Sequence, residues 1–163
     1  MKNFSRLSLL AAVVATLGTF SVSAIAATAT GTASATVLTP IAIAAGTALN
    51  FGTLAGNASG GTVVVTDTGA RSVTGSVVVT TGAHSAGSFT VTGTGASTFA
   101  VTYPASFDVV SGANTMAVVV TGAATGTLAA GTVSLPVGGT LTVGANQAAG
   151  SYTGTYTMTV EYN

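Results

Sequence analysis

Glycine punctuates this chain from residue 31 onward, and the stretches between the glycines are filled mainly with valine, threonine and alanine. The whole chain of 163 residues contains 22 glycines. Valine and threonine branch at Cβ, which suits a pleated strand and disfavours a helix, while the frequent glycines interrupt any long helical window. We therefore expect almost no helix after the first residues of the chain.

Short candidate strands recur between clusters of turn residues, at spacings typical of an antiparallel β-sandwich or barrel. The sequence thus predicts an all-β fold. The expected strands are Val37–Ile43, Ala48–Leu54, Thr62–Thr66, Ser72–Thr80, Ser88–Thr92, Thr98–Tyr103, Met116–Thr121, Thr140–Val143 and Tyr152–Tyr162.

Aspartate, glycine and proline predict several of the turns between these strands. Asp67-Thr68-Gly69 lies between two valine-rich runs, and its glycine can adopt a positive φ, so we expect a hairpin there. Residues 57–61 are expected to form a looser loop. Pro40 cannot donate a ladder hydrogen bond, which predicts a strand edge, a bulge or a switch between sheets, and Pro104 and Pro136 are expected to mark strand ends.

The N-terminus has the layout of a secretory signal peptide. Lys2 and Arg6 precede an apolar run over residues 7–17, and small residues at Ala24 and Ala26 suit a signal peptidase. The apolar run is shorter than the roughly 20 residues that span a bilayer, which argues against the alternative of an uncleaved anchor. We predict residues 1–26 as the signal peptide, residues 27–163 as a single exported domain, and a location in the periplasm, at the cell surface or outside the cell.

Charge is nearly absent from the predicted mature chain, where Arg71 alone opposes Asp67, Asp108 and Glu161, a net charge of −2. Nucleic-acid binding requires clustered cations, so this partner class is excluded. No stretch after the leader is apolar for 18 residues, so a membrane-spanning helix is not expected. Because near-neutral surfaces favour association, we expect self-association into a fibre or coat; the alternative is a monomer solvated by its hydroxyl groups.

The side chains that carry catalysis or bind metal are few. The chain has no cysteine, one histidine, His84, and three scattered carboxylates. Zinc requires several nitrogen or sulfur ligands and calcium requires clustered oxygens, and a Ser-His-Asp arrangement would have to use His84 in a turn-like segment. We therefore predict no enzyme activity, no cofactor and no metal site. The Thr-x-Thr pairs are too irregularly spaced for an ice-binding solenoid.

The last fourteen residues alternate strictly. Apolar residues, Tyr156, Met158, Val160 and Tyr162, fall on one face, and polar residues, Thr155, Thr157, Thr159 and Glu161, fall on the other. With Gly150 fourteen from the end and a penultimate tyrosine, this segment resembles the C-terminal strand of chaperone–usher pilus subunits. The resemblance implies that a periplasmic chaperone pairs with the strand and that an outer-membrane usher takes part in assembly.

Upstream segments extend the resemblance. Residues 49–54, 88–93 and 99–104 look like strands of such pilins, and the mature chain also resembles a family of small bacterial exported domains of unknown function (DUF4402-like). Pilins have an immunoglobulin-like sandwich that lacks its last strand, which the N-terminal extension of a neighbouring subunit supplies. The resemblance therefore implies an immunoglobulin-like antiparallel sandwich with the same deficiency.

The start of the mature chain also alternates. Ala29, Gly31, Ala33, Ala35 and Val37 fall on one face, with threonine and serine between them. The resemblance implies that residues 27–37 are a donor strand with Gly31 at a shallow position of the acceptor groove. The alternative is that this segment pairs within its own domain.

Two functions follow as expectations. The first is a structural subunit of a bacterial surface fibre or coat, assembled by donor-strand exchange and acting in adhesion or biofilm formation. The alternative is a non-polymeric secreted or periplasmic β-sandwich binding module.

Overall fold

The computed structural model describes residues 25–163, and the compact folded unit spans Thr36–Asn163. Residues 25–35 are exposed and have no regular secondary structure. Residues 1–24, which make up nearly all of the predicted signal peptide, lie outside the described part.

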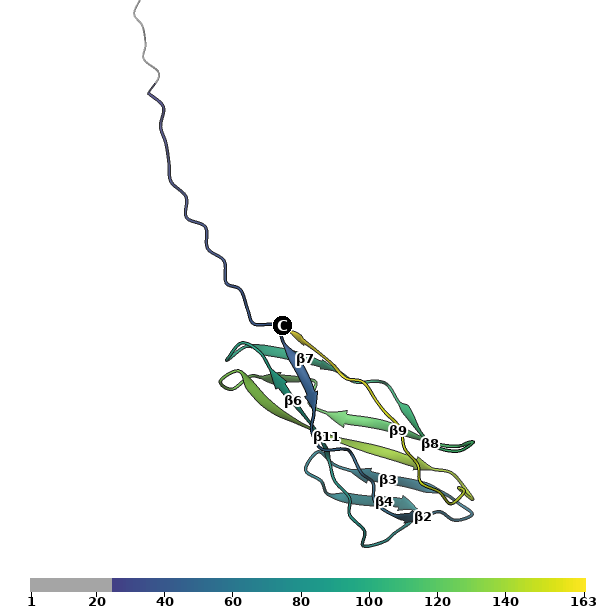
Figure 1. Cartoon of the computed structure of the whole chain (residues 1–163). Helices are drawn as coiled ribbons and strands as arrows, with labels where there is room; N and C mark the ends of the chain where they lie inside the picture. Colours follow the sequence, from purple (N-terminus) through teal and green to yellow (C-terminus); the bar gives the residue numbers. More distant parts are fainter. Residues whose placement is uncertain (1–24) are drawn as a thin grey trace, which may run out of the picture. The chain divides into compact units, whose positions relative to one another are not determined.

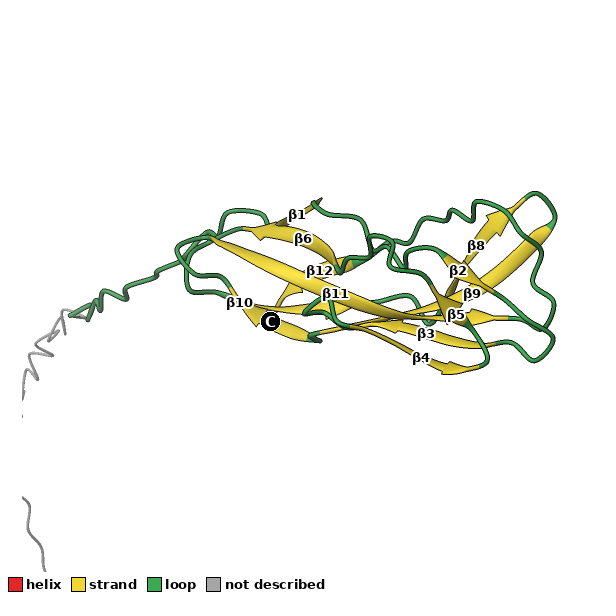
Figure 2. Cartoon of the chain, turned by 90° about the horizontal axis from the view of Figure 1, so that it is seen from below, coloured by secondary structure: helices red, strands yellow, loops and turns green. Residues whose placement is uncertain are grey.

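The folded unit is built from antiparallel strands, and no helix occurs among residues 25–163 (Figure 2). Its strands are β1 (Ala42–Ala45), β2 (Leu54–Ala55), β3 (Gly61–Val65), β4 (Arg71–Gly75), β5 (Val78–Val79), β6 (Gly87–Thr92), β7 (Thr98–Thr102), β8 (Phe107–Ser111), β9 (Asn114–Gly122), β10 (Thr125–Thr127), β11 (Thr132–Val143) and β12 (Thr159–Tyr162). The all-β prediction is confirmed.

Strand β11 organises the largest sheet (Figure 1). It pairs with β6 along residues 132–137, with β9 along 137–141 and with β3 along 139–143. Strands β1, β4 and β8 extend this sheet to seven strands, while β10, β7 and β12 form a second sheet and β2 and β5 a small third one. The result is a β-sandwich whose sheets enclose valine-rich cores.

Two clusters of buried residues fill the sandwich. The first is centred on Phe99 and Val91, which are fully buried, and includes Met158 and Val160. The second is centred on Val63 and Val118 and lies under the β2–β5 pair, with Phe51 and Tyr152 packed against it. At about 25 cal/mol per Å² of apolar surface removed from water, these clusters supply the main favourable term in folding.

The predicted hairpin at Asp67-Thr68-Gly69 is confirmed. The Gly69 N–H donates to the Thr66 carbonyl at 2.9 Å, and Gly69 has a φ of 84°. This turn joins β3 to β4. The predicted strand Ser72–Thr80 is instead two strands, because Gly75 turns the chain at a φ of 73°.

Several predicted strand bounds are wrong. The first strand covers Ala42–Ala45 and begins after Pro40, and the expected strand Ala48–Leu54 is reduced to a bridge at Asn50 and the short β2. Strands β8 and β10 were not expected. Pro136 does not end a strand: it lies inside β11, opposite Ser88. On the side of β11 that faces β9, pairing begins only at Val137. Pro136 therefore lies at an unpaired edge on that side, where its lack of an N–H group is tolerated.

The predicted strand Tyr152–Tyr162 is also wrong, because Tyr156 and Met158 lie outside any strand. Gly150, which was expected to belong to the chaperone-pairing segment, lies outside any strand as well. Only β12 is regular, and Thr153 forms an isolated bridge with Val110. Residues 154–158 stand opposite the longer segment 103–109, which contains Pro104. Because that segment carries extra residues and Pro104 lacks an N–H, a continuous ladder cannot form there.

Candidate functional site

A cleft of about 1050 Å³ opens between two segments of the folded unit, residues 45–56 and residues 147–156. We call these segments the first wall and the second wall. Apolar side chains from four strands of the large sheet line the space between them: Phe89, Phe107, Val109, Met116 and Leu141. The cleft is larger than most small-molecule sites, which occupy about 300 to 1,000 Å³.

The first wall is held to the rest of the fold along one edge. Asn50 exchanges two backbone hydrogen bonds with Ser85, each 2.9 Å long. Arg71 donates from Nη1 to the Phe51 carbonyl at 3.1 Å and from Nη2 to the Thr80 carbonyl at 2.6 Å. The wall lies close to β11 because position 139 is glycine: a Cβ there would lie 2.8 Å from the Leu49 Cδ2 atom.

The second wall is likewise tied along one edge. Thr153 and Val110 exchange backbone hydrogen bonds of 2.8 and 3.1 Å. Gln147 Nε2 donates to the Tyr152 hydroxyl at 2.8 Å, and that hydroxyl donates to the Ala148 carbonyl at 2.7 Å. These bonds fix the shape of the wall.

Two glycines allow the second wall to lie against β8. A Cβ at Gly154 would collide with the Asp108 carbonyl, and a Cβ at Gly150 would collide with the Ser111 side chain. The sequence therefore requires glycine at both positions for this close approach. Gly150, which we predicted as part of a chaperone-pairing strand, is thus placed at the cleft.

Both walls leave backbone groups without a partner. In an antiparallel pair, alternate residues direct their N–H and C=O groups to opposite sides of the strand, so Leu49 on the first wall and Tyr152 and Gly154 on the second point away from the existing bridges, whereas the Phe51 carbonyl accepts from Arg71. The N–H groups of Leu49, Tyr152 and Gly154 donate to no backbone group within residues 25–163. Such open edges are templates for pairing with a further strand.

An aromatic group lies at one end of the cleft. Tyr156 stacks on Phe107 with ring centroids 5.0 Å apart and meets Phe89 edge to face at 5.8 Å. Burial raises the pKa of the Tyr156 phenol above 10.0, because the phenolate loses solvation. Burial also raises the pKa of Tyr103, with a smaller contribution from Tyr156.

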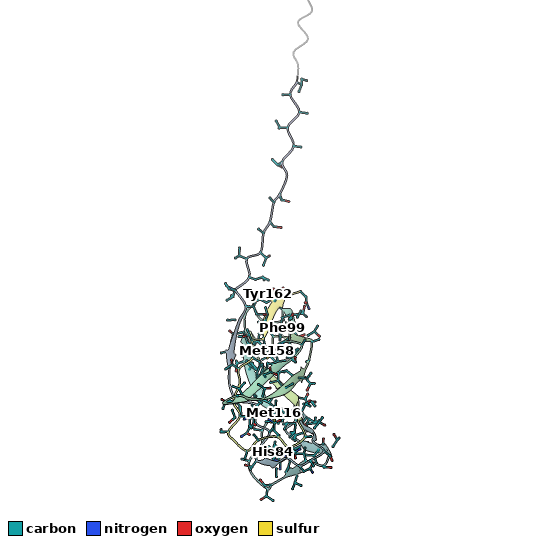
Figure 3. All side chains as sticks on the ribbon, turned by 90° about the vertical axis from the view of Figure 1, so that its right-hand side faces the viewer. His84, Phe99, Met116, Met158 and Tyr162 are labelled. Carbon is teal, nitrogen blue, oxygen red and sulfur yellow. The ribbon has the colours of Figure 1, made fainter. Side chains whose placement is uncertain are left out.

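The C-terminal residues follow the predicted alternation. Met158 and Val160 are buried in the core, Tyr156 and Tyr162 are half-buried, and the four intervening residues, Thr155, Thr157, Thr159 and Glu161, are exposed. Tyr156 lines the cleft, whereas Met158, Val160 and Tyr162 continue the segment toward the opposite end of the domain, where Figure 3 shows Tyr162 close to Phe99 and Met158.

The candidate donor residues lie in a segment without regular structure. Ala29, Gly31, Ala33, Ala35 and Val37 are all exposed, Val37 to 94%. A Cβ added at Gly31 would meet no atom within 4 Å. The first wall was missed as part of a site, although its apolar residues Leu49, Phe51 and Leu54 recur in the segment we expected to be a strand.

His84 lies in an exposed loop between β5 and β6, at the far end of the domain from Tyr162 (Figure 3). Within the described range, no group of three or more His, Cys, Asp or Glu residues comes together in a way that could hold a metal ion. The described residues also contain no helix that is long and apolar enough to cross a membrane.

The family model of a domain of unknown function (DUF4402) matches residues 41–162. The chain belongs to this family. The matched DUF4402 region begins one residue before β1 and ends with β12, so it includes both walls of the cleft and excludes residues 25–40. Comparisons with curated proteins and with solved structures gave no match.

Proposed function

We propose that this DUF4402 protein is a structural subunit of a bacterial surface fibre or coat, exported through its leader and assembled by strand addition between copies. The observation that carries the proposal is the cleft with an unpaired backbone edge on each wall. An extended peptide can add to such edges, its main chain supplying affinity and its alternate side chains supplying register.

The occupant we propose is residues 27–37 of a second copy. These residues are exposed and alternate between small apolar and hydroxyl side chains. The proposed strand has eleven residues and spans about 36 Å at about 3.3 Å per residue, which is enough to run along the ten residues of the second wall, which bends at Gly150. Small inward side chains suit a cleft that Phe89, Phe107 and Tyr156 already partly fill.

The rest of the chain supports association. The predicted mature chain carries so few charges that copies approach without strong repulsion. An open apolar cleft exposes a subunit to wrong pairing during export, so we also propose a periplasmic chaperone that covers it, with an outer-membrane usher as the site of assembly. A fibre of this kind would act at the cell surface, in adhesion or biofilm formation.

Deleting Thr28–Thr36 from the mature protein tests the proposal. We expect the deletion to abolish polymers, seen by electron microscopy and size-exclusion chromatography, and to leave the rest of the folded unit, from Val37 onward, folded. A synthetic peptide of residues 27–37 should raise the melting temperature of the truncated protein, because a ligand that binds only the native state stabilises it.

A peptide with the same composition in scrambled order is the matched control and should leave the melting temperature unchanged. If the truncated protein still polymerises, or if the intact mature protein stays monomeric under all assembly conditions, the fibre proposal is wrong. A monomer whose cleft instead binds a small molecule would be the binding module considered above.

A further inference from the structure

Three hydrogen bonds form a closed ring at the end of the domain where the chain enters its first strand. The Thr39 N–H donates to the Thr94 Oγ1 at 2.7 Å, and the Thr94 N–H donates to the Tyr162 hydroxyl at 2.7 Å. The Tyr162 hydroxyl then donates to the Thr39 carbonyl at 2.7 Å. We call these three residues the arm clasp; they join the lead-in to β1, the loop after β6 and the last strand.

The sequence around the clasp leaves room for the tyrosine hydroxyl. Position 93 is glycine, and a Cβ there would collide with the Tyr162 hydroxyl and lie 3.0 Å from the Leu128 Cδ1 atom. The Tyr162 ring packs against the first core cluster, and its backbone pairs with Phe99 in β7. The hydroxyl therefore has a fixed position, because both its ring and its strand are held by the core.

Below the clasp, the N-terminal end of the domain pairs with one neighbouring strand, and Ile41 and Ile43 pack against the first core cluster. Strand β1 is an edge strand of four residues, and its only ladder among the described strands is with β6. An edge strand that is pulled from one end loses its hydrogen bonds one after another, so each bond resists alone. Thr39 is instead held by two bonds at once, from its N–H to Thr94 and to its C=O from Tyr162, and both have to break before the chain is released, which requires a larger force.

We propose that the arm clasp is the point where tension on residues 27–38 enters the folded domain, and that it prevents β1 from peeling away from β6. The role of this anchor rests on the proposed function, since a neighbour that holds the N-terminal segment of each subunit would pull on Thr39 whenever the fibre is stretched. Through Tyr162 and Thr94, that pull passes to β7, β12 and the core.

Single-molecule force measurements on the monomeric protein test the clasp without requiring a fibre. The chain has no cysteine, so Thr30→Cys and Ser151→Cys provide unique attachment points on the N-terminal segment and on the second wall. Tyr162→Phe keeps the ring and removes the hydroxyl. We expect it to raise the rate of the first release event at a given force by about 2- to 10-fold, since one of the two hydrogen bonds that hold Thr39 is lost.

Two controls separate anchoring from general stability. Thr39→Val leaves the two backbone hydrogen bonds of residue 39 intact, so its first release event should occur at the same rate as in the parent protein. With attachment points at Ser72→Cys and Ser151→Cys, the pull bypasses the clasp, and Tyr162→Phe should then have no effect. The inference is overturned if Tyr162→Phe changes neither pull, or if it weakens both equally. Failure of the mature protein to polymerise would contradict the fibre proposal and leave these force measurements unaffected.

Discussion

Tyr156 lines the cleft and packs against the first core cluster, and its phenol makes the stability of the domain depend on pH in the alkaline range. Burial raises the pKa of Tyr156 above the value of 10.0 expected for the unfolded chain. Above pH 10 the unfolded chain therefore binds fewer protons than the folded protein, so stability falls as the pH rises. Below pH 10 this contribution is fully present.

We expect the urea midpoint of the parent protein to fall between pH 9 and pH 11.5, and to fall less for Tyr156→Phe, which cannot ionise. Urea unfolding followed by circular dichroism at several pH values measures both midpoints. The matched control is Tyr152→Phe, a second half-buried tyrosine of the same wall. Equal losses for the parent protein and Tyr156→Phe would show that the folded state does not disfavour this phenolate.

Met158 shows how the C-terminal alternation contributes to stability. Its side chain is 7% exposed and belongs to the first core cluster, although no ladder hydrogen bonds hold residues 154–158. We expect Met158→Ala to lower the free energy of unfolding by about 2 to 5 kcal/mol. The exposed neighbour Thr157 should tolerate alanine within about 0.5 kcal/mol. Chemical denaturation measures both variants, and similar losses would contradict the core position of Met158.

At the scale of the element, the N-terminal segment is defined by its alternation. If Ala29, Ala33 and Ala35 face into the cleft of a second copy, a charge on that face must be buried without a partner, which is strongly unfavourable. We expect Ala33→Asp to reduce polymer yield at least tenfold, since 1.4 kcal/mol already corresponds to a factor of ten. The adjacent Ser34→Asp adds the same charge on the solvent face and should polymerise normally.

Negative-stain microscopy and sedimentation give the polymer yields of the two variants. Because they differ by one position and carry the same charge, net charge cannot explain a difference between them. Equal yields would contradict strand addition through this face and favour a segment that is a simple spacer.

The strands illustrate which elements a sequence pattern can predict. The β3–β4 hairpin was predictable because its turn needs a glycine at positive φ and its strands are runs of valine. The interruption of the C-terminal strand at residues 154–158 was not predictable, because it depends on a mismatch in length with segment 103–109, which lies opposite only in three dimensions. Strand β11 was underestimated because Pro136 was expected to mark a strand end, whereas it lies inside the strand, and Gly138 and Gly139 allow neighbouring chain segments to approach.

At the scale of the whole molecule, the sequence predicted the fold class better than the candidate site. The absence of helix over residues 25–163 follows from composition, and the inward positions of the aromatic residues and Met158 in the C-terminal segment follow from periodicity. The cleft arises where two segments separated by about a hundred residues run along the same core without pairing to each other. Each wall taken alone has an ordinary β-type sequence, so no local pattern marks the space between them.

The arm clasp also determines how copies would be ordered. It places the root of the N-terminal segment beside Tyr162, whereas the cleft is formed by residues 45–56 and 147–156. The segment that a subunit would donate therefore lies apart from the cleft in which it would accept one, and a contact made in one direction only is heterologous. Repeated from copy to copy without closing into a ring, it would give a head-to-tail filament with two unlike ends: a free cleft at one and an unused N-terminal segment at the other.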